Sequence, residues 1–401
     1  MNRCLQTEQS HSLGSGRPKV AGPDLRVLAL ATYPVEAAAT RFRISQFVGP
    51  LAERGITLEM RPFLNARLFG ALYRRRDLSR TAIGLLRSSL RRIKDVVDAR
   101  KVDAVFVQRE AMLFGPPVVE YLIAQALSKP MVLDLDDATY VPYTSPTYGR
   151  LAGLLKWFGK TDDLIRWARV VTCGNRGIAD YVAGKGTRAI VIPTVVDTDR
   201  FCPDPARDTR RGAVPIIGWI GSHSTYPYLE SILPALQELA RTQPFRLRIV
   251  GAGRGDIALP GIDVECRDWA LEREIEDFQS LDVGLYPIVE DEWSVGKSGF
   301  KAIQYMAVGV PYVTSPVGAC AEIGEPGVTH LIASSSDDWH AGLADLLADA
   351  DRRGGMGEAG RRHALRHYTV ALQADRLAEA IRLAVGRDLE LETENADASP
   401  A

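Results

Sequence analysis

Short apolar runs alternate along the chain with longer amphipathic segments, and this alternation restricts the possible folds more than any other feature. Each run is rich in β-branched and other apolar residues, as buried strands are, and the segment after it has helical periodicity. The runs form two series, at residues 25–31, 56–60, 102–107, 131–135, 170–173 and 189–192, and at residues 216–220, 246–250, 264–266, 283–286, 311–314 and 330–332. Strands that alternate with helices build right-handed βαβ units and parallel sheets. We therefore expect two doubly wound, Rossmann-like α/β domains.

The length of the chain agrees with two domains, because 401 residues exceed the size that one hydrophobic core normally supports. Residues 198–212 are rich in Asp, Arg and Pro and lack an apolar period, so we expect the linker there. The N-terminal domain then covers residues 24–197, and the C-terminal domain covers residues 213–387, with a last helix that could pack back on the N-terminal domain. Residues 1–23 and the acidic residues 388–401 are expected to be a disordered leader and a disordered tail.

The composition argues against a membrane-spanning, secreted or nucleic-acid-binding protein. Charged residues interrupt every apolar run before it reaches the length of a transmembrane helix, and residues 1–23 lack the apolar core of a secretion signal. A net charge of -1 gives no overall attraction to nucleic acid. The five cysteines form no C-x-x-C pair and have no histidine at metal-ligand spacing, so neither a disulfide, a metal nor another cofactor is expected. These features favour a cytoplasmic protein.

Positive charge is concentrated in residues 67–101, which begin with Arg67 and end with Lys101. The stretch holds eleven Arg and Lys residues against three Asp residues, and its Leu, Ile and Val residues recur at helical spacing. Two interpretations stay open: a solvated helix whose apolar stripe packs on the sheet, or a surface that binds anionic lipid at the inner face of a membrane.

The run GKSGFKAIQYMAVGVP at residues 296–311 is the strongest functional signal. It predicts a loop that opens a helix, whose amide dipoles point at the loop and favour an anion. Lys297 and Lys301, four residues apart, are expected on one face of the first turns, where their charges would stabilise a departing diphosphate. Gly309 is expected to cap the end of the helix.

At this run the chain resembles glycosyltransferase family 4, a large family of retaining enzymes with the GT-B architecture. Residues 304–311 match the second half of the family's E-x7-E helix, and residues 309–333 resemble the stretch that follows it, with Glu322 in an acidic position. Residues 191–203 resemble the family's interdomain linker. The resemblance implies two Rossmann-like domains facing across a cleft, with a nucleotide-sugar donor bound by the C-terminal domain and a glycan or lipid-linked acceptor bound by the N-terminal domain.

The chain departs from the family motif at both acidic positions, which hold Gly296 and Gln304. In the family these glutamates contact the transferred sugar and the nucleotide ribose. Gln304 can still bond a ribose hydroxyl, whereas Gly296 offers only its backbone. We therefore expect Gln304→Glu, which restores one family acid, to keep or raise donor affinity.

The loop after the first strand of the donor domain also departs from the family, which places basic residues there. Gly221, Ser222, His223 and Ser224 instead offer amides and hydroxyls to phosphate oxygens. Trp269 stands where the family has its nucleobase-lining loop. For His223 a locally bonded loop residue, and for Trp269 a buried packing residue, are the alternatives.

Charged residues follow three predicted strands of the N-terminal half. Arg41, Arg43 and Arg109 could bind an anionic acceptor or form salt bridges. Asp136 and Asp137 end the fourth strand, at the edge where open α/β sheets bind their ligands, so they are expected to bind sugar hydroxyls or orient an acceptor hydroxyl. A metal site is the minor alternative.

Together with the resemblance, these residues imply transfer of a sugar from a nucleotide-sugar to an acceptor hydroxyl with retention, in the synthesis of bacterial cell-surface polysaccharide or glycolipid. Lys297, Lys301, Asp136 and Asp137 are the expected catalytic residues. Two alternatives stay open: a catalytically weakened GT-B protein that binds sugar nucleotides as a partner of an active transferase, and a GT-B-fold nucleotide-sugar epimerase.

Overall fold

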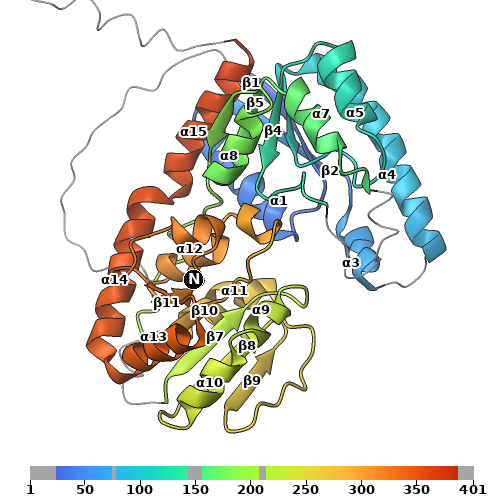
Figure 1. Ribbon diagram of the computed structural model, residues 1–401. Helices are drawn as coiled ribbons and strands as arrows, with labels where there is room; N and C mark the ends of the chain where they lie inside the picture. The colour runs from blue at the N-terminus through green and yellow to red at the C-terminus, as the bar shows by residue number, and fades with distance from the viewer. Residues whose placement is uncertain (1–23, 75–77, 143–155, 207–213, 387–401) are drawn as a thin grey trace, which may run out of the picture. The chain divides into compact units, whose positions relative to one another are not determined.

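The computed structural model describes residues 24–74, 78–142, 156–206 and 214–386. These residues form two compact units (Figure 1). The first unit contains Asp24–Val195, Asp291–Ser298 and residues 370–386. The second unit contains the described residues of Val196–Glu290 and Gly299–Thr369.

The first unit is built on a six-stranded parallel sheet in the order β2-β1-β3-β4-β5-β6. The strands are β1 (Leu25–Ala31), β2 (Ile56–Pro62), β3 (Ala104–Gln108), β4 (Met131–Leu135), β5 (Val170–Cys173) and β6 (Ala189–Val191). Their central members are buried on both faces, which explains their continuous apolar sequences. The helices are α1 (Ala38–Arg43), α2 (Val48–Ala52), α3 (Ala66–Arg74), α4 (Leu78–Asp98), α5 (Val118–Tyr121), α7 (Lys160–Trp167), α8 (Arg176–Ala183) and α15 (Val370–Ala384).

The second unit repeats this architecture with a parallel sheet in the order β12-β11-β10-β7-β8-β9. The strands are β7 (Ile216–Ile220), β8 (Arg246–Val250), β9 (Asp263–Arg267), β10 (Val283–Tyr286), β11 (Tyr312–Thr314) and β12 (Leu331–Ile332). The helices are α9 (Tyr226–Glu230), α10 (Leu233–Ala240), α11 (Glu274–Gln279), α12 (Phe300–Ala307), α13 (Ser336–Ala348) and α14 (Ala350–His367). Because the strand order reverses between β7 and β10, the loops after these two strands flank the topological switch point.

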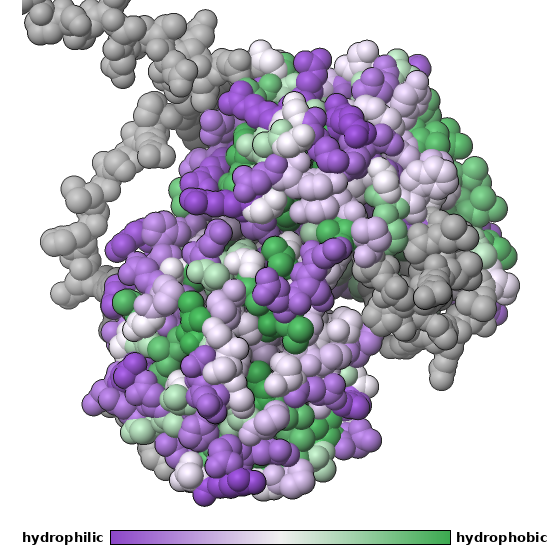
Figure 2. Space-filling view, in the orientation of Figure 1, coloured by the Kyte–Doolittle hydropathy of each residue, from purple (hydrophilic) through white to green (hydrophobic). Residues whose placement is uncertain are grey.

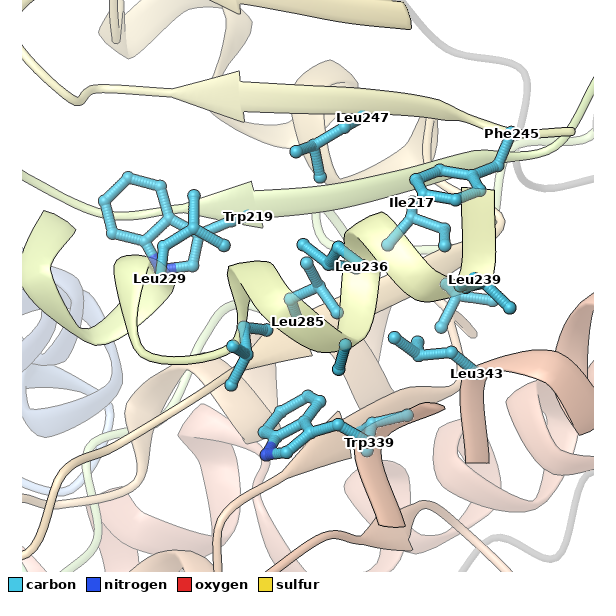
Figure 3. Packing of buried hydrophobic residues seen from close by; sticks show 14 of the residues in the cluster. Ile217, Trp219, Leu229, Leu236, Leu239, Phe245, Leu247, Leu285, Trp339 and Leu343 are labelled. Carbon is cyan, nitrogen blue, oxygen red and sulfur yellow. The ribbon is translucent and has the colours of Figure 1, made fainter. Parts of the chain in front are cut away.

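The core of the second unit is formed by side chains of the sheet and of helices α9, α10, α13 and α14. Figure 3 shows side chains of β7, β8 and β10, such as Trp219 and Leu285, meeting Leu236 of α10 and Trp339 of α13. Trp219 is only 3% exposed. Trp219 is therefore a core residue.

The predicted fold class is confirmed: each unit is a doubly wound parallel α/β sheet, and every predicted strand is present to within two residues at either end. The units are divided differently from the expected domains, because two segments of the expected C-terminal domain belong to the first unit. Helix α15 packs on α2, β4 and β5, and Arg54 pairs with Asp375 at 2.8 Å. Residues 291–298 are held by Asn175, whose amide donates to the carbonyl oxygens of Gly296 and Lys297.

The described part of the expected linker packs against the second unit. Phe201 is buried, and Arg361 of α14 donates to its carbonyl oxygen at 2.7 Å and to that of Thr198 at 2.9 Å. Residues 207–212 of the expected linker lie outside the described residues, as do the expected leader at 1–23 and the whole expected tail at 388–401. Among the described helices, none has the length and apolarity needed to cross a membrane.

Candidate functional site

Three charged side chains meet at the carboxyl ends of β3 and β4 in the first unit. Arg109 binds both carboxylate oxygens of Asp136, with Nη2 at 2.8 Å from Oδ2, and the same Nη2 donates to Asp137. Arg109 has a φ of 59°, a left-handed conformation that non-glycine residues seldom adopt. The structure thus brings three predicted site residues together through a strained backbone position at the ligand-binding edge of the sheet.

The two carboxylates of this cluster titrate differently. Burial alone would raise the pKa of Asp136, but the charge and hydrogen bonds of Arg109, supported by Arg43, hold it below its ordinary value. Burial raises the pKa of Asp137; Arg109 and Lys297 oppose this rise, and repulsion from Asp136 adds to it. Asp136 therefore stays ionised, while Asp137, with 29% of its side chain exposed, is the group that can gain or lose a proton in reach of a ligand.

Residues 291–298 lie against this cluster. The Ser298 hydroxyl donates to the carbonyl oxygen of Asp136, and Lys297 is close enough to Asp137 to lower its pKa. A Cβ atom on Gly296 would lie 2.2 Å from the Cβ of Ala138. Because no side chain fits at this distance, the acid of the family motif has no room at position 296.

The other two arginines expected near the acceptor, Arg43 and Arg41, have different surroundings. Arg43 is 2% exposed; its Nε donates to Asp134 at 3.0 Å and its Nη1 to the carbonyl oxygen of Ile192 at 2.6 Å. It is a structural residue of the core, which corrects its assignment to the acceptor site. Arg41 is half-buried on α1, where its guanidinium lies 4.7 Å from the ring centroid of Phe42.

Helix α12 begins later than the sequence predicts. Its first residue is Phe300, preceded by Gly299 with a φ of 64°, so Lys297 stands before the helix and belongs to the first unit. The expectation that Lys297 and Lys301 share a face of the first turns is therefore wrong. The end of the helix agrees with the prediction, because Gly309 follows it with a φ of 67°.

A chain of polar contacts links the first turns of α12 to α11 in the second unit. Lys301 Nζ donates to Gln304 Oε1 at 3.0 Å, and Gln304 Nε2 donates to Glu274 Oε1 at 3.5 Å. Gln304 and Glu274 are both buried, and Lys301 also lies 5.0 Å from the ring centroid of Phe278. The sequence did not single out Glu274, since it is one of several acids in an ordinary amphipathic segment.

The loops after β7, β8 and β9 lie close together. Ser222 and Ser224 share a hydroxyl hydrogen bond of 2.8 Å, and His223 beside them is exposed. A Cβ on Gly251 would lie 2.4 Å from the carbonyl oxygen of Gly221 and 3.4 Å from the Cβ of Trp269. The predicted donor residues of these loops are thus neighbours.

Two further predicted donor residues are on the surface of the second unit. Trp269 is 38% exposed, which corrects the alternative that it is a buried packing residue. Glu322 is exposed at the end of the short helix Gly318–Ala321.

A groove of about 390 Å³ opens at the ends of β10, β11 and β12. Its lining is rich in hydroxyls and includes Ser231, Glu290, Ser315, Ser334 and Trp339. It lies on the other side of the switch point from the loops after β8 and β9, which carry the predicted nucleobase contact. In the described part of the chain, no group of three or more His, Cys, Asp or Glu residues could hold a metal ion.

Part of the chain matches a family model and resembles proteins of known activity. The family model "Glycosyl transferases group 1" matches residues 214–349, which lie in the second unit and reach into residues 291–298. The chain is 29% identical over 210 residues to a GDP-mannose-dependent alpha-(1-6)-phosphatidylinositol monomannoside mannosyltransferase of Mycolicibacterium smegmatis, covering 47% of this chain and 55% of that protein. It is 25% identical over 215 residues to a D-inositol 3-phosphate glycosyltransferase of Corynebacterium aurimucosum, covering 47% and 50%. The chain thus spans about half the length of the curated relatives it matches.

Solved structures resemble nearly the whole chain. The sucrose-phosphate synthase of Thermosynechococcus elongatus has a TM-score of 0.64 at 12% identity, covering 91% of this chain and 100% of that one. Anabaena HepE in complex with UDP and glucose has a TM-score of 0.58 at 15% identity, covering 89% and 99%. At these identities the likeness shows the fold, which is the two-domain GT-B fold that the sequence predicts.

Proposed function

We propose that the chain is a glycosyltransferase that moves a sugar from a nucleotide-sugar donor to an acceptor hydroxyl. The observation that carries the proposal is the polar chain Lys301–Gln304–Glu274, which lies where the family resemblance puts the donor and within the segment that matches the glycosyltransferase family model. The resemblance to family 4 adds retention of the anomeric configuration to the proposal.

The second unit binds the donor in this proposal. Lys301 and the amides of the loop at residues 221–225 stabilise the negative charge that develops on the departing diphosphate. Gln304 and Glu274 bond the ribose hydroxyls, and the partly exposed ring of Trp269 stacks on the nucleobase. Glu274 restores, from α11, the acid that position 304 lacks.

The first unit supplies the carboxylates. Asp137 accepts a hydrogen bond from a hydroxyl of the acceptor or the sugar, and Arg109 and Asp136 hold its position. Lys297 adds a second positive charge beside Asp137. No protein nucleophile is needed, since a retaining transfer in this family is thought to proceed on one face with assistance from the leaving group.

The acceptor is proposed to be a glycan or a lipid-linked molecule of bacterial cell-surface polysaccharide or glycolipid synthesis. One relative is named for a phosphatidylinositol-linked acceptor, which supports a lipid-linked molecule. Another is named for D-inositol 3-phosphate, which carries no lipid. The proposed location is the cytoplasm, at the inner face of the plasma membrane, with residues 67–101 contacting anionic lipid.

A panel of nucleotide-sugars tests the donor. Binding stabilises the folded state by an amount set by the ligand concentration relative to Kd, so the melting temperature ranks the donors before any acceptor is known. We expect one nucleotide-sugar to raise the melting temperature of the wild type, and a Lys301→Ala variant to lose most of that rise. The best donor is then offered to a set of acceptors. No thermal shift with any donor would contradict the proposal.

A sugar-nucleotide-binding protein without transferase activity is the second candidate. It is favoured by one observation: position 296 has no room for the family acid, because its Cβ would overlap Ala138. Donor binding without turnover, with every acceptor tried, would support this candidate, and a rearranged free sugar would instead indicate an epimerase.

A further inference from the structure

Helix α4 exposes a row of apolar side chains and buries several polar ones. Five large apolar residues on it are between 50% and 61% exposed: Ile83, Leu86, Leu90, Ile93 and Val97. Their spacing of three and four residues places them on one face of the helix, which we call the α4 stripe. Figure 2 shows hydrophobic residues gathered over α4 at the right-hand edge of the molecule. Leu85 and Val96 do pack against buried clusters, so the interpretation in which the apolar residues pack inward holds for these two and is wrong for the α4 stripe.

A buried arginine determines which face of α4 turns inward. Arg92 is 2% exposed and donates to the carbonyl oxygens of Ala31, Arg61 and Ala111 at 2.9 to 3.0 Å. It also pairs with Asp95, four-fifths of a turn further on, at 2.8 Å. A rotation that buried the α4 stripe would break all of these bonds and leave a buried charge unpaired. The exposure of the stripe is thus built into the packing of the helix.

The exposed charges beside the α4 stripe are positive. Exposed basic residues on α4 and the turn after it are Arg80, Arg87, Arg91, Lys94, Arg100 and Lys101. Both carboxylates of the helix are occupied, since Asp95 is buried with Arg92 and Arg61, while Asp98 pairs with Arg61 at 2.8 Å and Lys101 at 2.9 Å. Within the described residues of α4, no carboxylate is exposed. Arg74, Arg75 and Arg76 have side chains outside the described residues.

The apolar stripe and the cations beside it indicate which kind of partner binds this surface. A second copy of the chain would bring the same cations together and repel. An anionic bilayer satisfies both parts, because apolar side chains enter the boundary of the acyl chains while Arg and Lys reach the lipid phosphates. We propose that α4 lies in the plane of an anionic membrane, with the α4 stripe, about 21 Å long at 1.5 Å per residue, inserted below the headgroups.

This inference deepens the membrane contact of the proposed function by replacing attraction between charges with insertion of named side chains. The membrane proposal rests on the proposed function in one respect: membrane binding would give the protein access to a lipid-linked acceptor. Its test measures vesicle binding and can fail or succeed whether or not the chain transfers a sugar.

The test is co-sedimentation of the full chain with vesicles of phosphatidylcholine alone and of phosphatidylcholine and phosphatidylglycerol in equal parts. The stripe variant is Leu86→Gln/Leu90→Gln/Ile93→Gln, and the charge variant is Arg87→Gln/Lys94→Gln/Arg100→Gln. The matched control is Val214→Gln/Val328→Gln/Leu365→Gln, which removes three exposed apolar side chains elsewhere. All nine positions are exposed, so the variants are expected to fold, and their melting temperatures check this.

We expect the wild type and the control to bind the anionic vesicles, and the stripe variant to lose at least about a hundredfold in partition coefficient. The partition coefficient of the charge variant on anionic vesicles is expected to fall about fivefold for each cation removed, so its preference for anionic over neutral vesicles is weaker. A Leu90→Trp variant should gain fluorescence emission that brominated lipid quenches.

Vesicle binding of the stripe variant equal to that of the wild type would overturn the proposal. The proposal would also be overturned if the wild type did not bind vesicles but formed a dimer in solution, and the stripe variant were a monomer. Donor binding by the wild type and the stripe variant is measured in parallel. If the wild type binds no donor, the proposed function is rejected, while the result of the vesicle experiment is unaffected.

Discussion

Each unit contains a polar cluster, and the two clusters are built from different interactions. In the first unit, Arg109, Asp136 and Asp137 form an ion-paired cluster after β3 and β4. In the second unit, the neutral amide of Gln304 separates the cation of Lys301 from the carboxylate of Glu274. A buried ion-pair cluster costs much stability when one partner is removed, whereas a hydrogen-bonded chain costs less. The comparison therefore predicts that variants of the first cluster unfold the protein or shift its pH profile, while variants of the second change donor binding.

The largest effect is expected from Arg109→Met. It leaves Asp136 buried and ionised without its partner, a change that typically costs about 3–5 kcal/mol. Urea unfolding measures it, and Arg246→Met is the control, because the Arg246–Asp263 pair is about half exposed on both sides. Equal unfolding midpoints of the two variants would mean that the Arg109 cluster stabilises the protein no more than an exposed ion pair does.

Lys301→Ala is expected to lower kcat/KM by roughly tenfold to a hundredfold with an unchanged unfolding midpoint. The reason is the loss of a charge-assisted contact with the diphosphate, worth about 1.5–3 kcal/mol. Steady-state kinetics with the best donor measures the change. If kcat/KM stays at the wild-type value, Lys301 does not bind the diphosphate.

Gln304→Glu sharpens the comparison, because the structure reverses the expectation drawn from the family motif. The new carboxylate would replace an amide that donates to Glu274 at 3.5 Å, so two buried carboxylates would face each other. We expect weaker donor binding in this variant and recovery in the swapped pair Gln304→Glu/Glu274→Gln. Donor titration calorimetry compares the three proteins. Donor binding by the single variant that equals or exceeds the wild type would mean that Glu274 is not part of the site.

Lys297→Ala tests the first cluster by pH. Lys297 lowers the pKa of Asp137, so its removal raises that pKa further above the ordinary value. If ionised Asp137 is needed, activity rises as pH rises through its pKa, and the variant reaches full activity only at a higher pH than the wild type. The pH profile of kcat/KM measures the shift. A uniform loss at every pH would instead indicate that Lys297 contacts the substrate directly.

The smallest effect at neutral pH is expected from His330→Gln in the second unit. Burial, with a smaller contribution from His363, lowers the pKa of His330 to about 4 from 6.5. Because the unfolded chain binds the proton more tightly, the folded state loses stability as pH falls from about 6.5 towards about 4 and is unaffected above that range. The variant should flatten this part of the curve of melting temperature against pH. A curve of unchanged slope would assign the acid sensitivity to other groups.

The sequence predicted the sheets well and the sites less well. Strand positions follow from local apolar runs, and the parallel direction of the strands follows from their alternation with helices. For Arg43 the sequence left a salt bridge and an acceptor contact open and could not identify the partner, because Asp134 is distant in sequence and only the sheet brings the two together. The same holds for Glu274, which nothing in its own segment distinguishes. The start of α12 was placed too early, since Lys297 and Ser298 bond to the first unit instead of continuing the helix.

The orientation of α4 shows why periodicity alone can mislead. Its sequence contains an apolar stripe at helical spacing, which normally turns inward. Arg92 and Asp95 occupy the inward face instead, through bonds to backbone carbonyl groups that no local pattern reveals.

The most direct test of the central claim is to incubate the wild type with its best-binding nucleotide-sugar and a water-soluble acceptor, and to follow both products by NMR. The account predicts release of nucleoside diphosphate and formation of the glycosylated acceptor in equal amounts, with the donor's anomeric configuration retained and the rate reduced in Lys301→Ala. Binding of the donor without either product, or release of a free or rearranged sugar in place of the glycosylated acceptor, would contradict it.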